Sequence, residues 1–531
     1  MYQIFPDRFR RDGSDTARNG FAEHEKRGQT VRVHADWSEP VEWKENMPGG
    51  EYAPVDFYGG TLRGIQEALP ELKALGVSVL YLNPIFEASS NHRYDTGCYD
   101  RVDPILGSNQ DLTRLCAEAK KLGIRIVLDG VFAHTGADSK YFNRFGNYPG
   151  AGAYHSKRSP YYKWYTFTDY PDQYRCWWDF RDLPSVNTED PSWQKHIVSG
   201  DKSVVKTWLR HGASGWRLDV ADELPDDVLC RIRTAVKDTD PDAVVLGEVW
   251  EDAVTKVSYD KLRKYALGDA LDSVMNYPLR LGMMPFFRGQ TMSGELRDLL
   301  LNQRLNYPKP LYYALMNLTA SHDIDRTRTA LAVDFEARDT TRDFQAAYTV
   351  TPEMSARGAK LQKLAAALQF ALPGIPSIYY GDEVGMEGFC DPFCRAPYAV
   401  VDPDMRAWYS RLAEIRNTHR ALRAGAVAVF APAEDVLCVL RAVTGGTDVF
   451  GGKAEDEALL TVLNRADRTV TCSVDLAAPG AGFTESERLA FLRTEYTRLV
   501  PADGGEAVSL SEGSVRLRLP ACSAVIFKLE K

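Results

Sequence analysis

Short apolar runs rich in β-branched and aliphatic residues alternate with segments of helical periodicity from the start of the chain to residue 423. Eight runs have the length and composition of strands, and they cover residues 2–5, 77–83, 124–131, 214–220, 243–249, 271–275, 314–320 and 377–380. Apolar positions three or four residues apart predict helices between them, over 62–75, 111–122, 192–211 and 355–370. Eight successive strand–helix units predict an α/β fold, the closed (β/α)8 TIM barrel.

Two regions depart from this pattern. Between residues 135 and 189, irregular sequence dense in Tyr, Trp and Phe follows the third strand, and such a long excursion is usually functional. We expect most of these rings to pack an insertion subdomain, and a few to line a cleft where flat ligand faces stack. After residue 423, strand-like alternation and Gly-Gly turns predict a C-terminal antiparallel β-sandwich. We therefore assign 1–134 and 190–423 to the barrel, 135–189 to the insertion and 424–531 to the sandwich.

Composition excludes several classes of protein. A chain of 531 residues is too long for a single small binding module. With 73 acidic against 64 basic residues and a net charge of -9, binding to nucleic acid is disfavoured. No run reaches the ~20 apolar residues that a membrane span needs, and the first residues lack a signal-peptide pattern, which predicts a cytoplasmic location. The nine scattered cysteines indicate reduced thiols rather than a disulfide framework.

Polar residues at the ends of three predicted strands mark the candidate site, because barrel enzymes react at the carboxyl ends of their strands. Alternation turns Arg217 and Asp219 together into the barrel mouth. Glu248 ends the fifth strand, and His322 and Asp323 follow the seventh. A purely structural alternative is that Arg217 and Asp219 form one buried ion pair while Glu248 caps a loop. Three carboxylates at three strand ends favour chemistry.

The chemistry that such carboxylates support is narrow. Carboxyl groups brought together in low dielectric have their pKa values pushed apart, which leaves one as an acid and one as an ionised nucleophile. Cleavage of glycosidic bonds uses such a pair. His134, after the third strand, could donate a hydrogen bond to a sugar hydroxyl and is matched by His322.

These segments resemble the signature regions of the α-amylase family of glycoside hydrolases, most closely its neopullulanase, cyclomaltodextrinase and maltogenic amylase branch. The resemblance covers nearly the whole chain and rests on segments 2–9, 56–60, 92–96, 183–187, 380–388 and 391–395, in order. It implies that Asp219 is the nucleophile, Glu248 the general acid and base, and Asp323 the group that distorts the sugar ring. It also implies substrate-binding roles for Tyr94, His134, Arg217, His322, Asp391 and Arg395, with Asp129 orienting Arg217.

Two departures from the family pattern concern calcium. Ala133 stands where the family often has Asn, and Thr61 stands where the neighbouring branch tends to have Asp. At each position a side-chain oxygen that could bind calcium is therefore lost. We therefore expect no required cofactor and no metal site, although Asp12 and Asp15 could bind calcium weakly. The branch usually has an N-terminal β-sandwich that supports dimerisation. Because this chain begins at the first barrel strand, we expect a monomer or a weak homodimer.

The sequence thus predicts a retaining hydrolase of α-1,4 glucosidic bonds, with α-1,6 bonds as a second class, acting on maltooligosaccharides, cyclodextrins, pullulan or starch. One alternative is a glucan transglycosylase that uses the same carboxylates. Another is a non-catalytic barrel subunit, which should lack those carboxylates and carry a membrane span. Asp222 and Glu223 stand where starch-cutting amylases carry Lys-His, so short or cyclic substrates should be preferred to starch.

Overall fold

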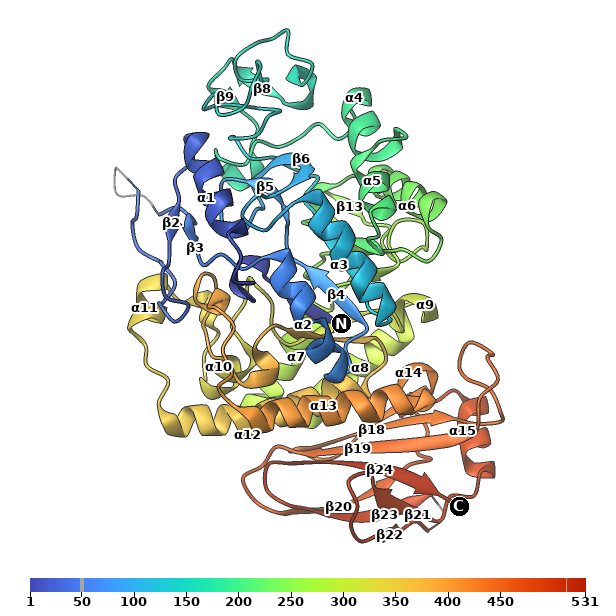
Figure 1. Cartoon of the computed structure of the whole chain (residues 1–531). Coiled ribbons are helices and arrows are strands. Elements are labelled where there is room, and N and C mark those ends of the chain that lie inside the picture. The colour runs from blue at the N-terminus through green and yellow to red at the C-terminus, as the bar shows by residue number, and fades with distance from the viewer. Residues whose placement is uncertain (48–51, 512) are drawn as a thin grey trace. The chain divides into compact units, whose positions relative to one another are not determined.

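The computed structural model describes residues 1–47, 52–511 and 513–531 (Figure 1). Contacts divide the chain into two compact units. The first consists of Met1–Met275 and Asp391–Ala399, and the second of Asn276–Cys390 and Val400–Lys531.

The eight predicted barrel strands are all present and parallel to their neighbours. The first unit holds six in the order β1 (Tyr2–Ile4), β4 (Val79–Leu82), β7 (Arg125–Gly130), β10 (Gly215–Leu218), β11 (Val244–Gly247) and β14 (Ser273–Val274). The second unit holds the parallel pair β15 (Met316–Leu318) and β16 (Ile375–Tyr379). Because helices connect these parallel strands along the chain, the fold class is confirmed as a (β/α)8 barrel.

Some of the helices between the strands begin at residues whose side chains cap them. The Thr61 hydroxyl accepts a hydrogen bond from the Gly64 amide at the start of α2 (Leu62–Ala74), and Ser108 and Asp111 form a capping box on α3 (Asn109–Lys121). The other helices of eight or more residues before the C-terminal strands are α1 (Thr16–Lys26), α6 (Asp226–Thr239), α7 (Tyr277–Arg288), α8 (Ser293–Asn306), α12 (Pro352–Ala371) and α13 (Pro403–Thr418).

The single helix predicted over 192–211 is wrong. The structure has α4 (Pro191–Gln194), a π-helical turn (Lys195–Ser199) and α5 (Val204–Arg210). Gly200 is extended (φ -64°, ψ 155°), and the Ser203 hydroxyl donates a hydrogen bond to the carbonyl of Val198, so the chain leaves the helix between them. Buried apolar residues continue on both sides of the break, at Ile197 and Trp208 for example. This explains why the periodicity looked unbroken.

The insertion after β7 consists mainly of loops. Its regular elements are two 3-10 turns (Tyr162–Trp164 and Trp177–Asp179) and the short pair β8 (Phe167–Asp169) and β9 (Gln173–Tyr174). Tyr141, Phe142 and Trp164 are buried in it, which is the packing role expected for most of its rings. A bridge between His134 and Ser185 joins the end of the insertion to the end of β7.

The C-terminal strands are antiparallel, as predicted. They form a six-stranded sheet of β17 (Ala426–Ala433), β18 (Val436–Val443), β19 (Glu457–Asn464), β24 (Ser523–Glu530), β21 (Arg498–Pro501) and β22 (Val508–Ser509), and a two-stranded sheet of β20 (Val470–Asp475) and β23 (Ser514–Leu519). Alternate residues such as Leu440, Leu460 and Leu517 share one buried core, because side chains alternate between the faces of a strand.

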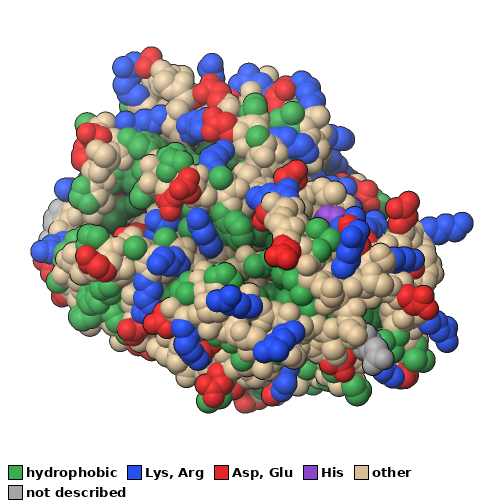
Figure 2. All heavy atoms as spheres, turned by 90° about the horizontal axis from the view of Figure 1, so that it is seen from below, with side chains coloured by type: hydrophobic (Ala, Val, Ile, Leu, Met, Phe, Trp, Pro, Cys, Tyr) green, Lys and Arg blue, Asp and Glu red, His purple; other side chains and the backbone are tan. Residues whose placement is uncertain are grey.

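The surface fits the mixed charge of the sequence. On the face drawn in Figure 2, Lys and Arg side chains lie among Asp and Glu side chains, with apolar side chains between them. None of the helices in the described ranges is long and apolar enough to cross a membrane.

Candidate active site

Arg217 on β10 is the centre of a buried cluster of carboxylates. Its Nη1 lies 2.9 Å from Asp129 Oδ1 and 2.7 Å from Asp219 Oδ1, and its Nη2 lies 2.9 Å from Glu248 Oε2. The parallel register sets Arg217 beside Asp129 of β7 and Leu246 of β11, two residues before Glu248. One guanidinium thus joins the ends of three neighbouring strands. The purely structural alternative expected one ion pair between Arg217 and Asp219, whereas Arg217 contacts three carboxylates.

Glu248 is held by two further donors. The Val220 amide donates to its Oε2 at 2.8 Å, and the Trp250 indole donates to its Oε1 at 2.9 Å. Val220 adopts a left-handed conformation (φ 38°, ψ 60°), which is a strained outlier for a β-branched residue. Such strain is found where the surrounding structure over-determines a functional geometry. Here it aims the amide that follows Asp219 at the carboxylate of Glu248.

The cluster has more negative than positive charge. Burial and the negative charges of Glu248 and Asp129 raise the pKa of Asp219 well above its ordinary value, although Arg217 opposes this shift. Burial likewise raises the pKa of Asp129, again against the effect of Arg217. Asp219 and Asp129 therefore retain a proton more readily than isolated carboxyl groups do.

Asp129 is positioned by two tyrosines. Its Oδ2 accepts hydrogen bonds from the Tyr81 hydroxyl at 2.6 Å and from the Tyr94 hydroxyl at 2.9 Å. Tyr94 is among the site residues predicted from the sequence, whereas Tyr81 and the donor Trp250 are not. Tyr81 could have been found, since alternation along the predicted strand 77–83 points it the same way as Asn83, which donates to the Tyr94 hydroxyl.

His134 lies at the edge of the site, and its imidazole ring is buried. Burial lowers its pKa to about 4, so the ring is neutral near pH 7. Its Nε2 lies 3.1 Å from the carbonyl oxygen of Tyr94, and since a carbonyl only accepts, Nε2 must carry the proton. The buried Nδ1, which has no hydrogen-bond partner in the described ranges, is then an acceptor rather than the donor expected from the sequence.

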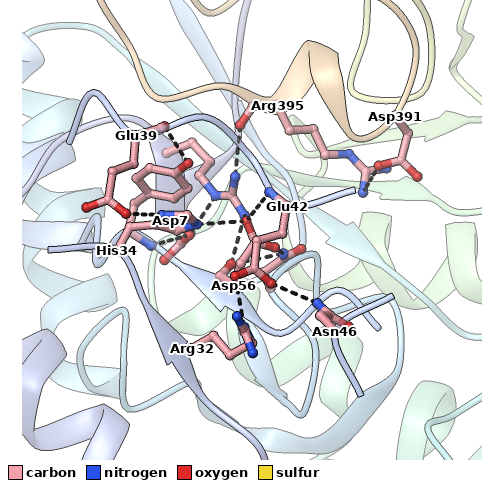
Figure 3. A network of polar contacts seen from close by, with 12 residues as sticks. Asp7, Arg32, His34, Glu39, Glu42, Asn46, Asp56, Asp391 and Arg395 are labelled. Atoms are coloured by element: carbon pink, nitrogen blue, oxygen red, sulfur yellow. Dashed lines mark hydrogen bonds and ion pairs between the residues drawn. The ribbon is translucent and has the colours of Figure 1, made fainter. Parts of the chain in front are cut away.

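Asp391 and Arg395 form an ion pair of 2.8 Å in the segment Asp391–Ala399 (Figure 3). A second arginine supports this segment, since Arg8 donates from Nη1 to the carbonyl of Arg395 and from Nη2 to the carbonyl of Asp56. Asp56 also contacts His34, whose other ring nitrogen lies 2.9 Å from Glu39. The loop with Asp391 and Arg395 is therefore held by a network of residues from the N-terminal region.

His322 and Asp323 belong to the second unit, where they follow β15. His322 Nε2 lies 3.2 Å from Asp323 Oδ2, and His322 is almost fully buried whereas Asp323 is partly exposed. The structure thus places these two residues together at the end of a barrel strand. It groups Arg217, Asp219 and Glu248 separately, in the first unit.

Four residues bear on the calcium sites that the sequence analysis considered. Ala133 offers no side-chain oxygen, and the Thr61 hydroxyl is engaged as the cap of α2. Asp15 pairs with Arg18 at 2.8 Å. Of these two aspartates, Asp12 alone has a buried carboxylate oxygen that lacks a hydrogen-bond partner within the described residues. Calcium prefers six to eight oxygen ligands. This set of side chains falls well short of that number.

Comparison with known proteins decides the family. A model of the α-amylase catalytic domain matches residues 3–421. The chain belongs to the α-amylase family. It is 35% identical, over 99% of its length, to the amylopullulanase of Thermoanaerobacterium saccharolyticum, of which it covers 41%. The family predicted from the motifs is therefore confirmed.

Other members of the family match over more of their length. The chain is 32% identical to the cyclomaltodextrinase of Geobacillus thermopakistaniensis, with 90% of this chain and 71% of that protein covered. The solved cyclic α-maltosyl-(1→6)-maltose hydrolase from Arthrobacter globiformis superposes with a TM-score of 0.74 at 25% identity, covering 99% and 97% of the two chains. By contrast, this chain spans about two fifths or less of the first two amylopullulanases that it matches.

Proposed function

We propose that this protein is a retaining α-glucan hydrolase that cleaves α-1,4 glucosidic bonds, with α-1,6 bonds as a second class. The observation that carries the proposal is the sharing of one guanidinium by Asp219 and Glu248, at the ends of adjacent strands. In a retaining enzyme the nucleophile and the acid lie about 5 to 5.5 Å apart. Two carboxylates held by one arginine are suited to that separation.

In the proposed mechanism, Asp219 attacks the anomeric carbon while Glu248 gives its proton to the departing glycosidic oxygen. Glu248 then removes a proton from water, which attacks the same carbon and releases Asp219, so the product keeps the α configuration. Arg217 holds both carboxylates in place throughout, with Asp129 fixing its orientation. Asp323 and His322 are assigned to the same sugar, and Tyr94, His134, Asp391 and Arg395 to substrate binding.

The substrates proposed are maltooligosaccharides, cyclodextrins, pullulan and starch. This range is supported by the names of the relatives, which include a cyclomaltodextrinase and amylopullulanases. The second candidate is a glucan transglycosylase that uses the same site. The two reactions differ only in the acceptor of the glycosyl group, which is water in hydrolysis and a sugar in transfer. We further propose a monomer or weak homodimer, without bound calcium, in the cytoplasm.

The experiment is product analysis with two matched variants. Asp219→Asn and Glu248→Gln each keep the shape of the side chain, so both should fold and both should lose nearly all activity on maltooligosaccharides. Proton NMR of the wild-type reaction should show the α anomer first. Near-normal activity in either folded variant, or early β product, would contradict the proposal. A glucose acceptor added at high concentration separates hydrolysis from transfer.

A further inference from the structure

A row of aromatic rings leads from His134 to the surface of the insertion. The rings of His134 and Trp177 are stacked at a centroid distance of 5.6 Å and an interplanar angle of 27°. Trp177 in turn stacks with Trp178 at 5.3 Å and 20°, and with Phe180 at 5.8 Å and 23°. Trp177 thus lies nearly parallel to each of three rings, and it connects His134, for which we propose a role in sugar binding, with the solvent-exposed rings.

The outer rings of this row are not part of a core. Trp178 is 74% exposed and Phe180 is 56% exposed, whereas Tyr141 and Trp164 of the same insertion are buried. Burial of apolar area stabilises the inner rings but leaves the exposure of Trp178 unexplained. Large exposed apolar groups gathered in one place mark surfaces that bind something.

The backbone that presents these rings is strained. Trp178 has φ 45° and ψ 39°, and the next residue, Asp179, also has a positive φ of 63°. A left-handed conformation is unfavourable in a bulky residue, and it persists only where its surroundings enforce it. Backbone hydrogen bonds from Phe180 to Trp177 (2.8 Å) and from Leu183 to Phe180 (2.9 Å) enforce it here.

Trp177 is the inner tryptophan of the row. Its Nε1 is buried and has no hydrogen-bond partner among the residues that the structure describes, so the indole contributes to the surface through the face of its ring. Flat rings suit glucose, whose faces are apolar and whose edge consists of hydroxyl groups.

We infer that Trp177, Trp178 and Phe180 form an aromatic platform that binds further glucose units of an α-glucan chain beyond the sugar at His134. The inference rests on the proposed function, because it assigns the platform to the same substrate. Asp222 and Glu223 alone are expected to bind long glucan chains weakly. The platform adds affinity for these chains and so makes them better substrates. It acts on binding and leaves the chemical step unchanged.

The test is a chain-length series with Trp178→Ala, Phe180→Ala and the double variant. The double variant should lose about tenfold in kcat/KM on maltoheptaose, equivalent to about 1.4 kcal/mol, and should keep wild-type activity on a chromogenic maltoside. Trp178→Phe keeps a flat ring and should retain most of the affinity. Phe145→Ala is the matched control, because Phe145 is 57% exposed in the same insertion but lies outside the row.

Equal losses on the short and the long substrate would mean that the rings only support His134, and would overturn the inference. So would a double variant that behaves like the wild type on maltoheptaose. Migration in native gels containing amylose separates the two proposals. If amylose retards the wild type but not the double variant, the platform is supported. If the wild type also releases no sugar, hydrolysis is refuted while the platform stands.

Discussion

Asp129→Asn tests whether the charge balance around Arg217 sets the pH range of activity. Burial and two negative neighbours raise the pKa of Asp219, and Asp129 is one of those neighbours. Because the nucleophile must be ionised, activity falls as the pH drops through its pKa. The substitution removes one negative charge and leaves Arg217 with one partner fewer, and both changes favour ionised Asp219. The acid limb of the pH profile should therefore move to lower pH.

The size of the shift follows from the geometry. Asp129 and Asp219 contact the same Nη1 of Arg217 at 2.9 and 2.7 Å. Unit charges about 5 Å apart at an effective dielectric constant of about 20 repel by about 3 kcal/mol, and one pKa unit corresponds to about 1.4 kcal/mol. The full charge would thus shift the pKa of Asp219 by about two units. Because the raised pKa of Asp129 lowers its average negative charge, we expect a smaller shift than this, of about one unit.

The assay is kcat/KM on a chromogenic maltooligosaccharide between pH 3 and 9, which reports the ionisation of the free enzyme. Tyr81→Phe is the control, because it removes a hydrogen bond to Asp129 without removing the charge and should move the limb less. Circular dichroism at each pH separates unfolding from titration. An acid limb that stays in place in Asp129→Asn, or moves to higher pH, would refute this reasoning.

Three further predictions concern metal, pH and substrate. Treatment with a chelator should leave rate and melting temperature almost unchanged, and a large loss restored by calcium would contradict this. Burial disfavours the charged form of His34, but its hydrogen bonds to Asp56 and Glu39 raise its pKa above the ordinary value. Protonated His34 should therefore stabilise the fold fully below about pH 6.5. This stabilisation should be lost as the pH rises through the raised pKa of the folded protein. The melting temperatures of wild type and His34→Gln should therefore differ most in acid and converge in alkali. Asp222 and Glu223 only accept hydrogen bonds when ionised, so once Trp178→Ala and Phe180→Ala remove the aromatic platform, kcat/KM per reducing end should favour maltotriose and cyclodextrin. A tenfold preference for starch in that double variant would refute this.

The barrel and its principal carboxylates were predictable because both follow short-range rules. Strand alternation placed Arg217 and Asp219 on one side, and the rule that barrel sites lie at strand ends added Glu248. The break at Gly200 was missed because buried apolar residues lie at helical spacing on both sides of it, up to Val198 and again from Val204. The polar segment between them, with Ser199 followed by Gly200, is the signal that could have indicated it. The role of Trp250 was also hidden, because a side chain two residues beyond a strand has no periodicity to indicate its direction.

Long-range support of the site was the least predictable feature, and it changes how the family motifs are interpreted. Asp7 accepts hydrogen bonds from the amides of Tyr58 and Gly59, both at 3.0 Å. A Cβ atom on Gly60 would lie 2.2 Å from the carbonyl oxygen of Pro6, so only glycine allows the two segments to approach so closely. The segments 2–9 and 56–60, both part of the resemblance, therefore pack against each other and present Arg8 to the carbonyl of Arg395. They fix the loop that bears Asp391 and Arg395. Gln3 also donates to Asn83, which donates to the Tyr94 hydroxyl beside Asp129. A motif can thus identify the family through packing as securely as through chemistry.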